Sequence, residues 1–251
     1  MSSYQRFEAS SNLDDLNVAI QNWKEWVLLV EGNTSANNMY YAGVSILVLL
    51  LLDRIERLGD LVDVEDAVRF SRLALKSHVG ENDHKPELLS NLGIALSNRF
   101  KHLGDIEDLN AAIIHEEQAL NLTPDGHPDK PSRYNNLGVS LRTRFNRLGN
   151  VDDLNAAIVH QEQALNLTPD GHPDKPPRYN SLGVSLRTRF DHLGNVDDLN
   201  AAIVHQEHAL NLTPDRHPDK PLRYSNLGAS DRKSTRLNSS HSGESRMPSS
   251  A

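Results

Sequence analysis

Histidine recurs along the chain at a fixed interval of 45 residues, and its imidazole suits metal binding and proton transfer near neutral pH. Two such sets exist: His127, His172 and His217, and His115, His160 and His205. The ligands of one metal ion must converge on it, whereas corresponding residues of successive repeats lie roughly 10 Å apart. We therefore predict no metal site and no cofactor. The first set is expected to fix loops between units, and the second to lie on helices.

Arginine recurs at the same interval, each time directly before an apolar residue: Arg54, Arg99, Arg144 and Arg189. These arginines could form a basic stripe for an acidic partner. Alternatively, they pair internally with aspartates that repeat at the same interval: Asp63, Asp108, Asp153 and Asp198. Because acidic residues outnumber basic ones by 34 to 26, the composition favours internal pairing.

Motifs for catalysis are absent from the sequence. It contains no Gly-rich phosphate loop, no nucleophile elbow and no His-Glu-x-x-His motif. It has no cysteine, which removes a thiolate nucleophile and disulfides. A residue present in several equivalent copies also does not suit the role of one unique catalytic group. We predict that the chain is not an enzyme and has no catalytic residue.

The net charge and the apolar segments indicate the class of partner and the compartment. A formal charge of −8 disfavours nucleic acid and anionic membranes. The most apolar stretch, residues 39–52, spans about 14 residues, is too short to cross a bilayer and reads as a buried helix. The N-terminus lacks the apolar core of a signal peptide. We predict a cytoplasmic protein that binds neither nucleic acid nor membrane.

The repeating unit reads as two helices, which residues 130–169 illustrate. Pro131 suits the first turn of a helix, and apolar residues then recur at spacings of three and four: Tyr134, Leu137, Leu141, Phe145 and Leu148. Gly149 is expected to end this helix in a left-handed conformation, and Asn150 or Asp152 to cap the next helix. Pro169 prevents that second helix from continuing.

The same unit resembles the tetratricopeptide (TPR) pattern of aromatic, Leu-Gly, two alanines and proline, carried here by Tyr134, Leu137, Gly138, Leu141, Ala157, Ala164 and Pro169. Gln161 departs from the pattern, because it occupies a slot that prefers Phe, and this predicts looser or differently filled packing. The unit is also about 11 residues longer than the usual 34. In this it resembles kinesin-light-chain-type repeats and the 45-residue TPR arrays of fungal proteins.

The resemblance covers residues 12–230 and implies an all-α fold, a right-handed superhelical solenoid of antiparallel helix pairs. The expected units are residues 35–78, 86–123, 131–168, 176–213 and a partial fifth unit, 221–230. Residues 1–11 are expected to be a disordered N-terminus.

Residues 231–251 leave the repeat pattern in the middle of a helix. The stretch from Asp231 to His241 resembles the translation of a sequencing-library adapter, which predicts a non-native, disordered tail and a natural protein truncated in its fifth pair. By composition alone, the segment would instead be a Ser-rich basic linker. The preceding helix, 221–230, lacks its partner and is expected to fray.

In TPR arrays the first helices of the pairs line a concave groove that holds a peptide. By this resemblance, the groove of the present chain is presented by Ser90, Asn91, Asn135, Asn136, Val139, Arg142, Asn180, Val184 and Arg187. Asparagine suits such a site because its amide both donates to and accepts from a peptide backbone. The alternative is that these are solvated polar positions on the face away from the core.

The resemblance thus predicts a protein–protein interaction module, a peptide-binding scaffold or sensor arm whose partner is an unidentified protein or peptide. The alternative belongs to a different class. It is the regulatory array of a larger enzyme or switch protein, whose caspase-like protease or nucleotide-binding domain was lost by truncation. This alternative rests on the resemblance to fungal proteins with similar arrays.

Overall fold

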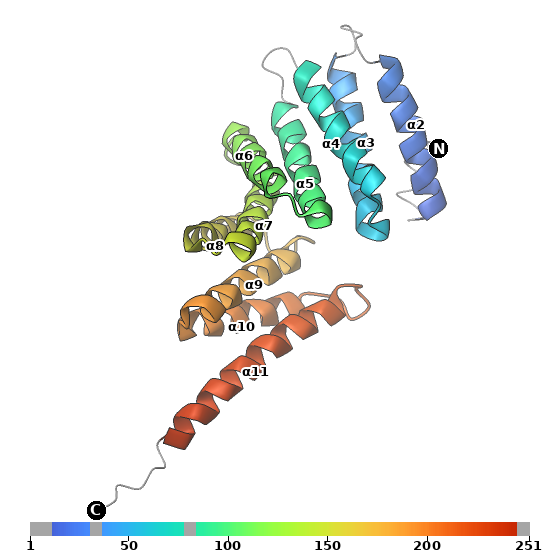
Figure 1. The fold of residues 1–251 in the computed structure, drawn as a ribbon. Coiled ribbons are helices and arrows are strands. Elements are labelled where there is room, and N and C mark those ends of the chain that lie inside the picture. Colours follow the sequence, from blue (N-terminus) through green and yellow to red (C-terminus); the bar gives the residue numbers. More distant parts are fainter. Residues whose placement is uncertain (1–11, 31–36, 78–83, 245–251) are drawn as a thin grey trace, which may run out of the picture. The chain divides into compact units, whose positions relative to one another are not determined.

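The computed structural model of the chain describes residues 12–30, 37–77 and 84–244, and all regular secondary structure in these residues is α-helical. The predicted all-α class is thereby confirmed. In chain order the helices are α2 (Leu13–Val30), α3 (Asn37–Leu58), α4 (Leu61–Ser77), α5 (Lys85–Leu103), α6 (Ile106–Leu122), α7 (Lys130–Leu148), α8 (Val151–Asn166), α9 (Lys175–Leu193), α10 (Val196–Asn211) and α11 (Lys220–Glu244) (Figure 1).

The turns inside the helix pairs follow the expected capping chemistry. Gly149 adopts a φ of 75° after α7, and its N–H donates to the Phe145 carbonyl oxygen at 2.7 Å. This left-handed conformation costs glycine little because it has no Cβ. The next residue, Asn150, caps α8 by accepting a hydrogen bond from the Asp152 N–H at 3.0 Å. Asn150 is therefore the capping residue, and Asp152 lies inside the first turn.

The chain divides into two compact units, residues 1–136 and 137–251, with the boundary inside α7. In a repeat array each helix contacts only its near neighbours, so few contacts cross any one point of the chain. We call these parts unit 1 and unit 2 and describe each by itself. In unit 1, α3 packs on α4 and α5 packs on α6, while in unit 2, α9 packs on α10.

Helix α3 supplies much of the core of unit 1. Its segment Asn38–Leu58 is the one described helix that is long and apolar enough to cross a membrane by length and composition. Its side chains instead pack against α2, α4 and α5, and Tyr41, Leu47 and Leu51 are at most 1 % exposed. The Tyr41 hydroxyl donates to the Ser77 carbonyl oxygen at 2.9 Å, which satisfies its polar end. The expectation of a buried helix at 39–52 agrees with this packing, but the expectation that the apolar helix is too short to cross a membrane is wrong, because the helix extends beyond residue 52.

In unit 2, α7 and α8 approach each other where a glycine faces a glutamine. A Cβ added to Gly138 would lie 2.7 Å from Cγ of Gln161 and 3.0 Å from the Ala157 carbonyl oxygen. Gln161 is buried, so the slot that the TPR pattern gives to Phe is differently filled rather than loose. The same contact recurs between Gly183 and Gln206.

Helix α11 differs from the sequence expectation. It continues to Glu244, so residues 231–244 are helical where disorder was expected. From Ala229 to Ser242 this segment contains neither proline nor glycine, the two residues that interrupt helices most strongly, so the helix of the fifth repeat can continue. Lys233 also forms an ion pair with Asp191 of α9. The expected disorder of residues 1–11 and 245–251 lies outside the described residues.

Candidate functional site

The arginines that recur before apolar residues are engaged inside the array. Arg144 donates from Nε to Oδ2 of Asp153 at 2.8 Å and from Nη2 to Oδ1 at 2.6 Å. The equivalent ion pairs join Arg54 to Asp63, Arg99 to Asp108 and Arg189 to Asp198, at 2.5 to 2.7 Å. The hydrogen bond to Asp198 raises the pKa of Arg189 and outweighs the opposing effect of burial. Internal pairing is confirmed, so these arginines form no free basic stripe.

A second set of arginines, which sequence reasoning missed, holds the loops between the pairs. In unit 2, Arg178 is buried, donates to Oγ1 of Thr168 and pairs with Asp174 at 3.0 Å. Lys175 donates to the Thr168 carbonyl oxygen at 2.7 Å, and Nδ1 of His172 accepts from the Asp174 N–H at 3.2 Å. The predicted role of the loop histidines is confirmed. The sequence does contain a signal for these contacts, because Arg133, Arg178 and Arg223 repeat at the same interval of 45 residues as the Thr-Pro pairs that precede them.

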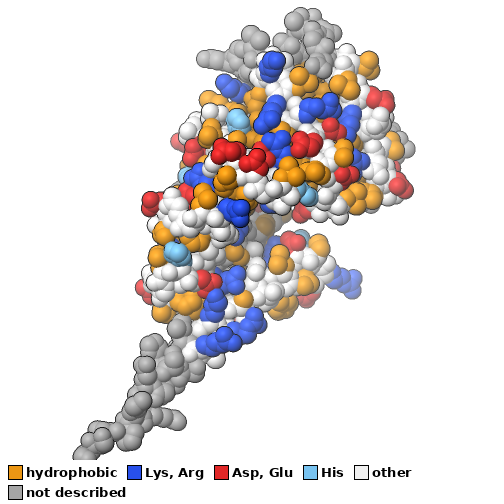
Figure 2. Space-filling model, in the orientation of Figure 1, with side chains coloured by type: hydrophobic (Ala, Val, Ile, Leu, Met, Phe, Trp, Pro, Cys, Tyr) orange, Lys and Arg blue, Asp and Glu red, His pale blue; other side chains and the backbone are white. Residues whose placement is uncertain are grey.

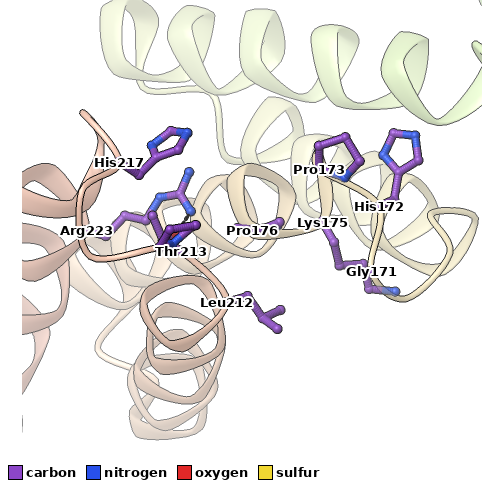
Figure 3. Close-up of a pocket in the computed structure, with 10 residues that line it drawn as sticks. Gly171, His172, Pro173, Lys175, Pro176, Leu212, Thr213, His217 and Arg223 are labelled. Atoms are coloured by element: carbon purple, nitrogen blue, oxygen red, sulfur yellow. Dashed lines mark hydrogen bonds between the residues drawn. The ribbon is translucent and has the colours of Figure 1, made fainter.

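Two successive loops of unit 2 enclose a cavity of about 270 Å³, drawn in Figure 3. Pro173 and His172 lie on one side of the view, and His217 and Arg223 lie on the other. Arg223 donates to Oγ1 of Thr213, and Lys175 donates to backbone carbonyls, so the cations that line the cavity already have partners. What remains is a surface of proline, leucine and imidazole, which suits a small apolar side chain.

The groove residues predicted in unit 1 lie on the first helices, with different exposure. Ser90 and Asn91 lie on α5, and Asn135 and Asn136 lie at the start of α7. Asn91 is only 4 % exposed, so it is packed inside the unit and does not reach a partner on the surface. Asn135 is half-buried, and its Oδ1 has no hydrogen-bond partner among the described residues.

The predicted groove residues of unit 2 share one side of α7 and α9. Val139 and Arg142 are three residues apart on α7, as are Val184 and Arg187 on α9, and this spacing places each pair on one helix face. All four side chains are partly exposed. Asn180 lies one turn before Val184, but its Oδ1 accepts a hydrogen bond from Nδ2 of Asn226 at 2.9 Å. That asparagine therefore pairs within the array.

Arg142 and Arg187 differ from the other arginines of the repeats. In the described part of the chain neither one forms a hydrogen bond or an ion pair with another residue, and the Nε atoms of both are buried without a partner. Burial, and secondly the positive charge of Arg187, lower the pKa of Arg142 below its usual value. Two like charges therefore lie near each other on α7 and α9, partly withdrawn from water.

The second set of histidines lies on the second helices, as predicted. His115, His160 and His205 are half-buried, and the Nδ1 atom of each has no hydrogen-bond partner in the described residues. Burial lowers the pKa of each imidazole, and His208 contributes to the effect on His205. Among the residues that the structure describes, no three His, Asp or Glu side chains converge as metal ligands would.

Basic and acidic side chains are interspersed over the face shown in Figure 2. This mixture fits a chain with 26 basic and 34 acidic residues, many of them joined in ion pairs. A uniformly charged surface of the kind that binds a phosphate backbone is not visible on this face.

Comparison with solved structures supports the helical repeat fold. The crystal structure of BtubC (BKLC) from P. vanneervenii, a helical repeat protein, is similar with a TM-score of 0.58 at 19 % sequence identity. The similarity covers 94 % of this chain and 93 % of that chain. At this identity the likeness concerns the fold alone. No protein-family model and no curated protein matches the sequence.

Proposed function

We propose that this chain is a TPR-type protein–protein interaction module that binds an extended or helical polypeptide segment along the first helices of its pairs. The observation that carries the proposal is the side of α7 and α9 that bears Val139, Arg142, Val184 and Arg187. These side chains are partly exposed, and the arginines have no partner in the described residues, whereas Leu137, Leu141 and other residues of the same helices are buried in the array.

The chemistry of this side suits a polypeptide. Valine offers apolar surface for a partner side chain, and the guanidinium group offers several N–H donors in a fixed plane. Repetition of both at 45 residues presents the same pair of features twice in unit 2. A partner segment that runs across α7 and α9 would meet an apolar and a cationic contact at each helix.

The proposal also includes the compartment and the kind of role: the chain acts in the cytoplasm as a scaffold or sensor arm and has no catalytic role. The net charge of −8 and the interspersed surface charges favour a protein partner over nucleic acid or an anionic membrane. The helical repeat fold supports a role in binding, because such arrays expose extended surfaces.

Selection from a random peptide library tests the proposal. Peptides displayed on phage are selected on the purified full chain, and the affinity of the best peptide is then measured by calorimetry. A carboxylate at the proposed contact would disfavour apolar packing, so the double variant Val139→Asp with Val184→Asp should bind at least about tenfold more weakly.

The matched control changes the exposed valines of the second helices, in the double variant Val159→Asp with Val204→Asp. These residues are 54 % and 49 % exposed and lie on the second helices, α8 and α10. The control should keep the affinity of the unmodified chain. Failure to select any specific peptide, or equal losses in both double variants, would rule out the proposed face.

A further inference from the structure

A groove of about 350 Å³ in unit 1 is lined by four basic side chains, although the chain as a whole is acidic. Helix α4 contributes Arg69, Arg72 and Lys76, and α5 contributes Arg99. The spacing of three and four residues places the cations of α4 on one face of that helix. The groove is also lined by one carboxylate and two apolar side chains: Glu65, Val68 and Leu73.

The cations of α4 depart from the repeat. Counting forward by 45 residues from Arg72 gives a glutamate on the second helix of each of the next three pairs: Glu117, Glu162 and Glu207. The position of Lys76 is asparagine in those three helices, and the position of Arg69 is isoleucine or valine. A second helix thus forms with glutamate and asparagine there, so the cations of α4 are not a condition of its folding.

Arg69 and Arg99 are already compensated by carboxylates of unit 1. Arg99 pairs with Asp108 at 2.5 Å and with Glu65 at 3.3 Å. Arg69 pairs with Asp66 at 2.9 Å. These two guanidinium groups therefore have internal counter-charges, and Glu65 is used by one of them.

Arg72 and Lys76 differ from these two, because both are exposed and neither forms a hydrogen bond or an ion pair within the part of the chain that the structure describes. They lie four residues apart on α4, so their charged groups can reach one ligand. Burial and, to a smaller extent, the charge of Arg72 lower the pKa of His115, which places Arg72 near α6. The groove thus presents two uncompensated positive charges beside the apolar side chains of Val68 and Leu73.

One phosphate monoester matches these two charges. It carries about two negative charges near neutral pH and three strong acceptor oxygens. The planar guanidinium group of Arg72 can donate two parallel N–H bonds to it, and the ammonium group of Lys76 adds a compact positive charge. A single carboxylate would balance only one of the two cations.

The small number of cations favours a polypeptide as the source of the phosphate. Nucleic-acid sites neutralise on the order of six to ten phosphates, and anionic lipid surfaces attract clusters of about four to eight Lys and Arg residues. The groove offers two uncompensated cations in a chain of net charge −8, which is too few for either. A polypeptide supplies a single phosphate together with apolar neighbours for Val68 and Leu73.

We propose that the groove of α4 and α5 binds a phosphorylated serine or threonine side chain of a partner polypeptide through Arg72 and Lys76. The inference goes beyond the proposed function, because it uses none of the residues on the face of α7 and α9. The groove lies wholly in unit 1 and does not depend on residues 231–251. Such a site makes binding of the partner depend on its phosphorylation.

The test measures binding of three labelled peptides to the full chain by fluorescence anisotropy at low salt. The peptides have blocked ends and the same uncharged sequence around a central phosphoserine, serine or glutamate. We expect the phosphoserine peptide to bind, and the serine and glutamate peptides to bind at least about tenfold more weakly. Inorganic phosphate in excess should displace the phosphoserine peptide.

The double variant Arg72→Glu with Lys76→Asn should lose the preference for phosphoserine. It introduces the residues that α6, α8 and α10 carry at these positions, so the melting temperature should stay unchanged. The milder variant Arg72→Gln alone should weaken phosphoserine binding at least about threefold. The control, Lys101→Glu with Arg147→Asn, changes two exposed cations outside the groove with the same change in net charge and should retain the preference.

Three outcomes would overturn the inference. Equal loss of phosphoserine binding in both double variants would indicate general electrostatic attraction. Equal affinity for the glutamate and phosphoserine peptides would show that the groove does not select phosphate. Co-sedimentation with vesicles that contain phosphoinositides, without binding of the phosphoserine peptide, would assign the groove to a membrane surface.

The valine variants separate this inference from the proposed function. Val139→Asp with Val184→Asp should bind the phosphoserine peptide as tightly as the unmodified chain. If peptides selected on phage depend on the valines but the phosphoserine peptide does not bind, the proposed face stands and the phosphate site is wrong. If the phosphoserine peptide binds but no selected peptide depends on the valines, the phosphate site stands and the proposed function fails.

Discussion

Arg144 holds the carboxylate of Asp153 with two hydrogen bonds, at 2.8 Å from Nε and 2.6 Å from Nη2, and so joins the end of α7 to the start of α8. Asp153 is only 6 % exposed, and the same pair recurs in the other complete helix pairs. The repeated arginines, which the sequence alone also allows as a basic binding stripe, therefore form ion pairs that join the two helices of each pair.

Replacement of Asp153 by Ala should destabilise unit 2. The change leaves the Arg144 guanidinium without its partner, but that side chain is 25 % exposed, so water offsets part of the cost. We expect a loss of about 1–3 kcal/mol in the free energy of unfolding, measured by urea denaturation. Asp152→Ala, at an exposed neighbour in the same helix turn, should cost less than about 1 kcal/mol. Equal losses would contradict the account of the ion pair.

Replacement of Gly138 by Ala should also destabilise, against the usual trend. Alanine normally stabilises a helix by about 1 kcal/mol relative to glycine. Here the new Cβ would lie 2.7 Å from Gln161 Cγ and 3.0 Å from the Ala157 carbonyl oxygen, so α7 and α8 must separate. We expect a loss of about 1–3 kcal/mol by urea denaturation.

Gly228 provides the matched control for that change. It occupies the same position of the repeat in α11, where the nearest atom to a new Cβ is Nη1 of Arg232 at 3.6 Å. Gly228→Ala should therefore leave stability unchanged or raise it. A stabilising effect of Gly138→Ala would show that the two helices are less closely packed than the distances indicate.

Replacement of the buried glutamines by methionine should stabilise unit 2. Gln161 and Gln206 are 1 % exposed, and both amide atoms of each lack a hydrogen-bond partner among the described residues. Methionine has a similar size and no polar group to desolvate, so each change should gain about 1–2 kcal/mol in chemical denaturation. Gln163→Met, on the exposed side of α8, should change stability little. A loss at Gln161 would indicate that its amide has a partner.

Acidification should destabilise the array through the half-buried histidines His160 and His205. Burial lowers the pKa of both, so the folded state binds protons less readily than the unfolded state, whose histidine pKa is about 6.5. Their stabilising contribution is therefore complete above about pH 6.5 and is lost as the pH falls from there towards the folded-state pKa.

The double variant His160→Gln with His205→Gln should show a smaller drop in the free energy of unfolding between about pH 7.5 and pH 5 than the unmodified chain. Val159→Gln with Val204→Gln, which introduces glutamine at the preceding exposed positions, should keep the original drop. An unchanged drop in the histidine variant would show that other groups control the acid response.

Local chemistry made the helices and their ends predictable from the sequence. Gly149 and Asn150 act on residues at most four positions away, so their spacing alone indicates a left-handed stop followed by a cap. The pairing of Arg144 with Asp153 could likewise be anticipated, because both recur at 45 residues in an acidic chain.

Contacts that depend on tertiary packing were not predictable in the same way. Arg178 reaches Thr168 across a loop, and Asn180 accepts a hydrogen bond from a residue 46 positions later. Sequence spacing also did not show that Asn91 is buried while Val139 stays partly exposed. The adapter-like origin of residues 231–251 remains a prediction, which re-sequencing of the transcript checks.

Site-specific photocrosslinking tests the central claim, that the face of α7 and α9 binds a polypeptide segment. A benzoylphenylalanine residue is introduced at Val139 or Val184, and at Val159 or Val204 for comparison, and each chain is irradiated with the selected peptide. We predict strong crosslinks from Val139 and Val184 and weak ones from Val159 and Val204, which lie on the second helices. Stronger crosslinks from Val159 and Val204 would contradict the claim.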